Sequence, residues 1–157
     1  MIALEQRGAP TSPALPGRRL VLVATDGSPI GTRALDHALD LVRLLDARLC
    51  VLHVLPDPLP CGRPELYDVQ LGLLRRGGEA VLAAARRRLR RAGADFLLPS
   101  CRGRSTGQVI VEEAARLGAA EIVLGSRGRV AREVEARATL PVVFAAGPVA
   151  VRRTVRS

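Results

Sequence analysis

Five short apolar runs alternate along this chain with longer segments in which apolar residues recur at helical spacing. The first run, Leu20–Ala24, is almost continuously apolar, which is typical of a strand that helices cover on both faces. Similar runs predict further strands over residues 48–54, 96–100, 121–124 and 141–145.

The segments between the strands predict helices. The first begins at Pro29 with Ser28 as its N-cap, and its apolar residues repeat with the helical period. The others are predicted over residues 65–92, 105–117 and 130–138. Gly77 and Gly78 lie inside the long helix, which can be either continuous or interrupted at that pair.

This alternation of strand and helix predicts the α/β fold class, with a parallel sheet and right-handed crossovers. Periodicity alone does not give the strand order. In an open parallel sheet, ligands bind beyond the carboxyl ends of the strands, where the strand order reverses. If the first and fourth strands are neighbours at that point, Asp26 and Gly125 lie close together.

Length and composition fit one domain, because 157 residues of which 48% are hydrophobic can form a sizeable core. Residues 1–17 are predicted to be a flexible N-terminal tail, 18–147 the domain, and 148–157 a basic C-terminal tail. No apolar run is long enough to span a membrane, and residues 1–17 lack the apolar core of a signal peptide. The sequence therefore predicts a cytoplasmic protein with no membrane contact.

The formal net charge is +9, and all 24 basic residues are arginine. The lack of lysine excludes mechanisms that need a phosphate-binding lysine or a Schiff-base lysine. The positive excess favours anionic partners.

Cysteine and histidine give no sign of a reactive centre. The three cysteines include no CxxC pair, which argues against a disulfide framework or a zinc site, and Cys50 and Cys101 are interpreted as buried apolar residues. His53 is predicted to be packed in the core and His37 to be solvated, without partners for a triad. The sequence therefore predicts no catalytic residue and no metal site.

The segment after the fourth strand is the best candidate for binding. Residues 125–128 form a glycine loop that opens a helix, where free backbone N–H groups can meet an anion, and Arg127 and Arg129 lie beside it. The alternative is that the glycines serve only a tight turn. The role of Asp26 also has two interpretations, because an aspartate at a strand–helix turn can bind a ligand or the local backbone.

Segments 21–28, 52–54, 122–128 and 140–143 resemble the universal stress protein family, in the family's order. The resemblance extends over about residues 20–147. It implies a three-layer α/β/α fold like that of the adenine-nucleotide hydrolases, with a five-stranded parallel sheet in the order 3-2-1-4-5.

Many members of that family bind ATP through Gly, two residues, Gly, nine residues, and then Gly followed by Ser or Thr. Gly125 and Gly128 match the first half, while the best alignment of residues 130–134 leaves out the second half. A shortened loop removes N–H donors to a triphosphate, so we expect no tight ATP binding and no bound cofactor. The nucleotide-binding residues that the resemblance implies, as a vestigial site, are Asp26, Val54, Gly125, Ser126, Arg127, Gly128 and Arg129.

The resemblance also implies a homodimer through the C-terminal strand, for which residues 142–144 and 149–151 offer apolar edges.

A second surface is basic. Within residues 65–92, one helix face carries Arg86, Arg87, Arg90 and Arg91, which can contact nucleic acid non-specifically or be simply solvated. Aromatic residues make up only 2% of the chain, which leaves no platform for stacking bases.

The favoured interpretation is a stress-response module that acts by dimerisation and contact with an unidentified protein, without catalysis. The alternative is an adenine-nucleotide-binding universal stress protein with nucleotide-dependent signalling or slow hydrolysis. An enzyme of the related nucleotide-hydrolase folds is disfavoured, because the SGGxDS loop of the pyrophosphatase type is absent.

Overall fold

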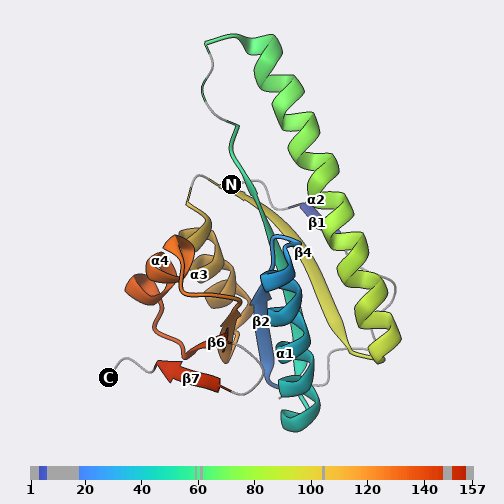
Figure 1. Ribbon diagram of the computed structural model, residues 1–157, viewed down its shortest axis with the longest axis vertical. Coiled ribbons are helices and arrows are strands. Elements are labelled where there is room, and N and C mark those ends of the chain that lie inside the picture. The colour runs from blue at the N-terminus through green and yellow to red at the C-terminus, as the bar shows by residue number, and fades with distance from the viewer. Residues whose placement is uncertain are drawn as a thin grey trace.

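A single sheet forms the middle layer of the protein, with helices on both faces (Figure 1). The computed structural model describes residues 4–6, 18–58, 60, 62–103, 105–146 and 150–154. Helices α1 (Pro29–Leu45) and α2 (Pro64–Ala92) pack on one face of the sheet. Helices α3 (Thr106–Leu117) and α4 (Arg129–Arg137) cover the other, which confirms the predicted three-layer α/β/α class.

The five central strands of the sheet are parallel and have the expected order. From one side to the other they are β4 (Phe96–Gly103), β3 (Arg48–Pro56), β2 (Leu20–Ala24), β5 (Glu121–Leu124) and β6 (Val142–Ala146). Strand order therefore reverses between β2 and β5, so the ends of these two strands are neighbours.

Within the described residues the sheet has seven strands, two more than the five that were predicted. Strand β1 (Leu4–Gln6) pairs antiparallel with β4, and β7 (Ala150–Thr154) pairs antiparallel with β6. Edge strands need no long apolar run, and neither segment has one. Both lie in segments that the sequence analysis treats as tails, and that division of the chain remains a prediction.

Helix α2 continues through the glycine pair without a break. A Cβ atom on Gly78 would lie 3.1 Å from two atoms of the His53 ring, so glycine lets the helix lie close to β3. The predicted N-cap Ser28 is confirmed, and Ser105 caps α3 in the same way. The Ser28 hydroxyl accepts from the Gly31 N–H at 3.1 Å, and the Ser105 hydroxyl accepts from the Gln108 N–H at 3.2 Å.

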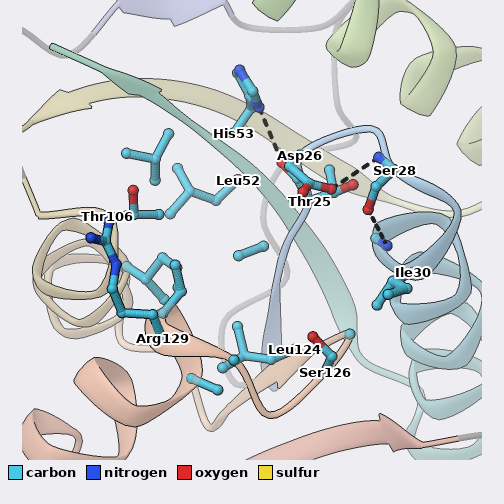
Figure 2. A pocket seen from close by; sticks show the side chains of 18 of the residues that line it. Thr25, Asp26, Ser28, Ile30, Leu52, His53, Thr106, Leu124, Ser126 and Arg129 are labelled. Carbon is cyan, nitrogen blue, oxygen red and sulfur yellow. Dashed lines mark hydrogen bonds between the residues drawn. The ribbon is translucent and has the colours of Figure 1, made fainter. Parts of the chain in front are cut away.

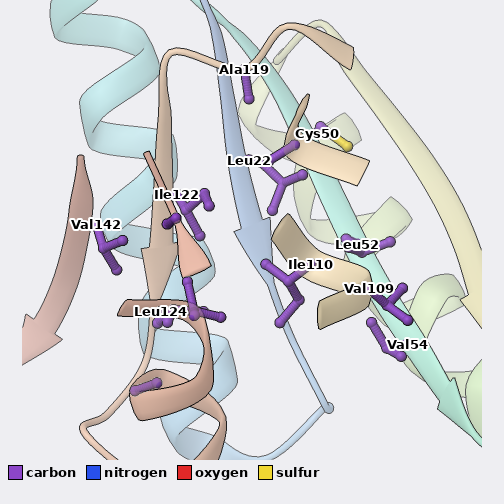
Figure 3. Packing of buried hydrophobic residues seen from close by; sticks show 14 of the residues in the cluster. Leu22, Cys50, Leu52, Val54, Val109, Ile110, Ala119, Ile122, Leu124 and Val142 are labelled. Atoms are coloured by element: carbon purple, nitrogen blue, oxygen red, sulfur yellow. The ribbon is translucent and has the colours of Figure 1, made fainter. Parts of the chain in front are cut away.

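Each face of the sheet has its own apolar core. Under α3 and α4, the side chains of Leu22, Leu52 and Ile122 pack with those of Ile110 and its neighbours (Figure 3). The free thiols of Cys50 and Cys101 are buried, as predicted. Burial raises the pKa of the Cys50 thiol to about 12 and that of the Cys101 thiol to about 11, so both are protonated at neutral pH. Cys61 lies outside the described residues.

Two features are absent from the described residues. None of the helices there combines the length and the apolar character that crossing a bilayer requires. No group of three or more His, Cys, Asp or Glu side chains in that part of the chain is placed to hold a metal ion.

Candidate functional site

A pocket of about 470 Å³ opens at the carboxyl ends of β2, β3 and β5. Its walls are completed by the first residues of α1, α3 and α4. Thr106 and Arg129 lie on one side of it, and Asp26 and Ser28 on the other (Figure 2). The volume is in the range of ligand-binding pockets, and the place is where parallel sheets bind their ligands.

The turn from β2 to α1 fixes the acidic side of the pocket. The Asp26 Oδ1 atom accepts from the Ser28 N–H at 2.9 Å, and the Gly27 N–H donates to the Thr25 hydroxyl at 3.2 Å. Gly27 has a φ of 80°, which favours glycine. Burial acts to raise the pKa of Asp26, but hydrogen bonds from Ser28 outweigh it and leave the pKa below its usual range. The carboxyl group is therefore ionised at neutral pH.

The connection from β5 to α4 forms the opposite wall and consists only of residues 125–128. Gly128 is the N-cap of α4, and among the described residues no side-chain hydrogen bond caps the helix there. The N–H groups of its first turn are thus left for water or an anion. Arg129 follows at once with a side chain that is 83% exposed, and its Nε atom is 3.8 Å from Glu133 Oε1.

A carboxylate from α4 accepts hydrogen bonds at the N-terminus of α3. Glu133 Oε2 accepts from the Ser105 hydroxyl at 2.9 Å and from the Gly107 N–H at 3.2 Å. A negative charge already satisfies this helix N-terminus, whereas the N-terminus of α4 has no such partner among the described residues. The N-terminus of α4, beside Arg129, is therefore a better place for an anion than the N-terminus of α3, beside Thr106.

Comparisons with known proteins identify the family of this chain. A sequence model of the universal stress protein family matches residues 17–140. The chain belongs to the universal stress protein family. This confirms the resemblance seen in the sequence, and no curated protein matches this universal stress protein in sequence.

Three solved structures illustrate the similarity. A universal stress protein family member from Burkholderia pseudomallei is 28% identical with a TM-score of 0.71, covering 80% of this chain and 93% of that chain. The universal stress protein from Archaeoglobus fulgidus in complex with dAMP is 25% identical with a TM-score of 0.62, covering 86% and 98%. UspA from Lactobacillus plantarum is 20% identical with a TM-score of 0.71, covering 80% and 96%, and shows the fold alone.

The structure brings most of the predicted site residues of this universal stress protein together. Those that line the pocket are Asp26, Val54, Gly125, Ser126, Gly128 and Arg129. Arg127 does not line it, because its guanidinium lies over the Phe144 ring, 4.7 Å from the ring centroid. A role in ligand binding remains a prediction for each of them.

Other lining residues were not predicted to belong to the site, among them His53, Thr106 and Ile110. His53 is buried as expected, at 8% exposure, but it also borders the pocket. Its Nδ1 atom is 3.1 Å from the Thr25 carbonyl oxygen, which can only accept, so Nδ1 carries the proton. The place of His53 near the end of a parallel strand was the available signal for it.

Proposed function

We propose that this universal stress protein is a non-catalytic module whose pocket binds an adenine nucleotide through a single phosphate, as in AMP. When ATP binds, its β- and γ-phosphates are expected to make no additional contacts with the protein. The observation that carries the proposal is the short connection before α4. Residues 125–128 lead straight into one uncapped helix start, so the pocket offers an anion site of limited extent. A triphosphate needs more donors than one helix turn provides.

The charges around the pocket support this assignment. Arg129 and the start of α4 favour a phosphate on one side, while the ionised Asp26 on the other suits hydroxyl or amino donors of a nucleoside. Apolar side chains such as Val54 and Leu124 also line the pocket and can contact a base. The related Archaeoglobus fulgidus protein, whose structure is a complex with dAMP, supports a ligand of this size.

The prediction is that ATP binds no more tightly than AMP, because the two additional phosphates find no protein donors. Replacing Arg129 with alanine should weaken AMP binding about tenfold, since hydrogen bonds to charged groups contribute roughly 1.5–3 kcal/mol. Adenosine should bind both proteins equally. Isothermal titration calorimetry of AMP, adenosine and ATP with magnesium at fixed salt measures all three effects.

Arg132→Ala is the matched control, because Arg132 is exposed on α4 but does not line the pocket. This variant should bind AMP as the unchanged protein does. Binding of ATP tenfold or more tightly than AMP would contradict the proposal, and ATP turnover above the uncatalysed rate would favour the alternative of nucleotide-dependent signalling or hydrolysis. Failure of every nucleotide to bind would leave protein contact as the function.

We also propose that the module acts as a homodimer through the outer edge of β7. Strand β6 is already paired with β7, so the unpaired backbone groups at this end of the sheet belong to β7. Sedimentation velocity should show a dimer, and a variant with Val151→Pro and Arg152→Pro should be monomeric because proline removes backbone donors. Glu5→Pro, in β1 at the opposite edge, is the control and should stay dimeric. The protein partner and non-specific nucleic-acid contact through α2 remain predictions.

A further inference from the structure

Helix α2 is much longer than the surface it covers. It has 29 residues, and its buried residues are Gly78, Leu82, Ala85 and Leu89, all in its second half. The first half extends beyond α1, α3 and α4 (Figure 1). There Leu66, Val69 and Leu73 are exposed by 44%, 58% and 57%. These three are named the α2 stripe.

The α2 stripe forms one line along the helix. Its members are three and four residues apart, which places them above one another on one face. The face toward the protein is different, since it carries the partly buried Tyr67 and Leu74. A surface helix ordinarily has polar residues on its outer face, and a run of exposed large aliphatic side chains there is typical of a protein contact site.

The stripe is held in place from behind. The Arg102 Nε atom donates to Asp57 Oδ1 at 2.8 Å, and its Nη2 atom donates to the Tyr67 hydroxyl. The same guanidinium lies 5.9 Å from the centroid of the Tyr67 ring. These contacts fix the first turns of α2 to the end of β4. A partner would therefore meet a preorganised surface, which lowers the entropy that binding costs.

The charges beside the stripe are arranged for a second copy of this chain. Exposed Glu65 and Asp68 lie at its beginning, and exposed Arg75 and Arg76 follow its end. In an antiparallel pair of α2 helices related by a two-fold axis between Val69 and Gln70, Leu66 lies opposite the partner's Leu73. Glu65 then lies opposite the partner's Leu74, two residues from the partner's Arg76, so the long Glu65 and Arg76 side chains can meet across the pair. The apolar and the charged contacts are satisfied in the same register.

We propose that the α2 stripe is an interface between two copies of this chain, formed by antiparallel pairing of the first halves of α2. A helix of another protein with acidic flanks would be repelled by Glu65 and Asp68. A nucleic acid would use the arginines and leave Leu66, Val69 and Leu73 exposed to water. The second copy accounts for both ends of the stripe and for its apolar middle.

The expected contact is weak. Three apolar side chains from each copy bury less than the roughly 1,200 Å² of a stable interface. The stripe and β7 are on different parts of the fold, because α2 packs over β3 and β4 while β7 is at the opposite edge. The stripe can therefore join two dimers and is expected to act at high protein concentration.

The test is disulfide trapping at Val69→Cys, in a Cys61→Ser background without nucleotide. Native Cys50 and Cys101 are buried and do not compete. Under mild oxidation, Val69→Cys should cross-link two copies about tenfold faster than Leu44→Cys, a control on α1 that is 81% exposed. Adding Leu73→Glu to Val69→Cys should reduce the cross-linking rate about tenfold.

Charge reversal provides an independent readout. With Val69→Cys, either Glu65→Arg or Arg76→Glu alone should slow cross-linking, and the two together should restore it, because the pairing is exchanged between copies. Cross-linking no faster than that of Leu44→Cys would overturn the proposal. A helix of another protein would then be the favoured partner of the α2 stripe. Cross-linking that requires an added DNA duplex would overturn it as well, since the nucleic acid would then be holding the copies together.

Discussion

Replacing Phe144 with alanine is expected to lower the free energy of unfolding by about 3–5 kcal/mol, the usual range for deleting a buried aromatic ring. Phe144 is 1% exposed, in β6, and belongs to the core beneath α3 and α4. Its ring also supports Arg127, whose guanidinium lies 4.7 Å from the ring centroid. Urea denaturation at neutral pH measures the loss.

Two variants separate the packing of Phe144 from its contact with Arg127. Phe144→Leu keeps much of the apolar volume and should cost no more than about 1.5 kcal/mol. Arg127→Ala removes only the cation–π contact at the surface and should cost about 0.5–1 kcal/mol. If Phe144→Ala were as mild as Arg127→Ala, the core at this strand would not be packed as described.

Replacing Gly125 with valine is the second large effect, with an expected loss of about 3 kcal/mol of unfolding free energy. A Cβ atom there would lie 2.8 Å from the carbonyl oxygen of Ile30 and 3.0 Å from its carbonyl carbon. Main-chain atoms cannot rotate away as a side chain can, so β5 and the start of α1 must separate. Both border the pocket, and AMP binding should be lost together with stability.

Gly128→Ala is the matched control for this prediction. The nearest atom to a Cβ at Gly128 is the Ser126 hydroxyl oxygen at 4.0 Å, and the φ of −95° suits any residue. Thermal unfolding should therefore give a result close to that of the unchanged protein. Equal damage from Gly125→Val and Gly128→Ala would contradict the close contact of Gly125 with α1.

Much of the fold could be predicted from the sequence, because buried parallel strands such as Leu20–Ala24 are apolar on both faces. Strand order came from the family resemblance, since periodicity carries no information on neighbours. The two edge strands could not be predicted, because they are short and need no apolar face toward a second layer. The close approach of α2 to the His53 ring at Gly78 could not be predicted either, because no local pattern reveals a contact between distant elements.

For the candidate site, the sequence located the backbone better than the side chains. Asp26 and Gly125 lie at the end of neighbouring strands, so strand order alone brings them to one pocket. The direction of the Arg127 side chain depends on the Phe144 ring of another strand. Thr106 and Ile110 reach the pocket from α3 on the far side of a crossover, and only the tertiary structure places them there.

The carboxylate of Glu133 has one further consequence. It is on α4, one turn beyond Arg129, and it binds the first residues of α3 through Ser105 and Gly107. The two helices are thereby fastened at their leading ends by a single side chain. A displacement of the first turn of α4 therefore also displaces the start of α3. An anion that binds in the pocket would shift both helices on that face of the sheet.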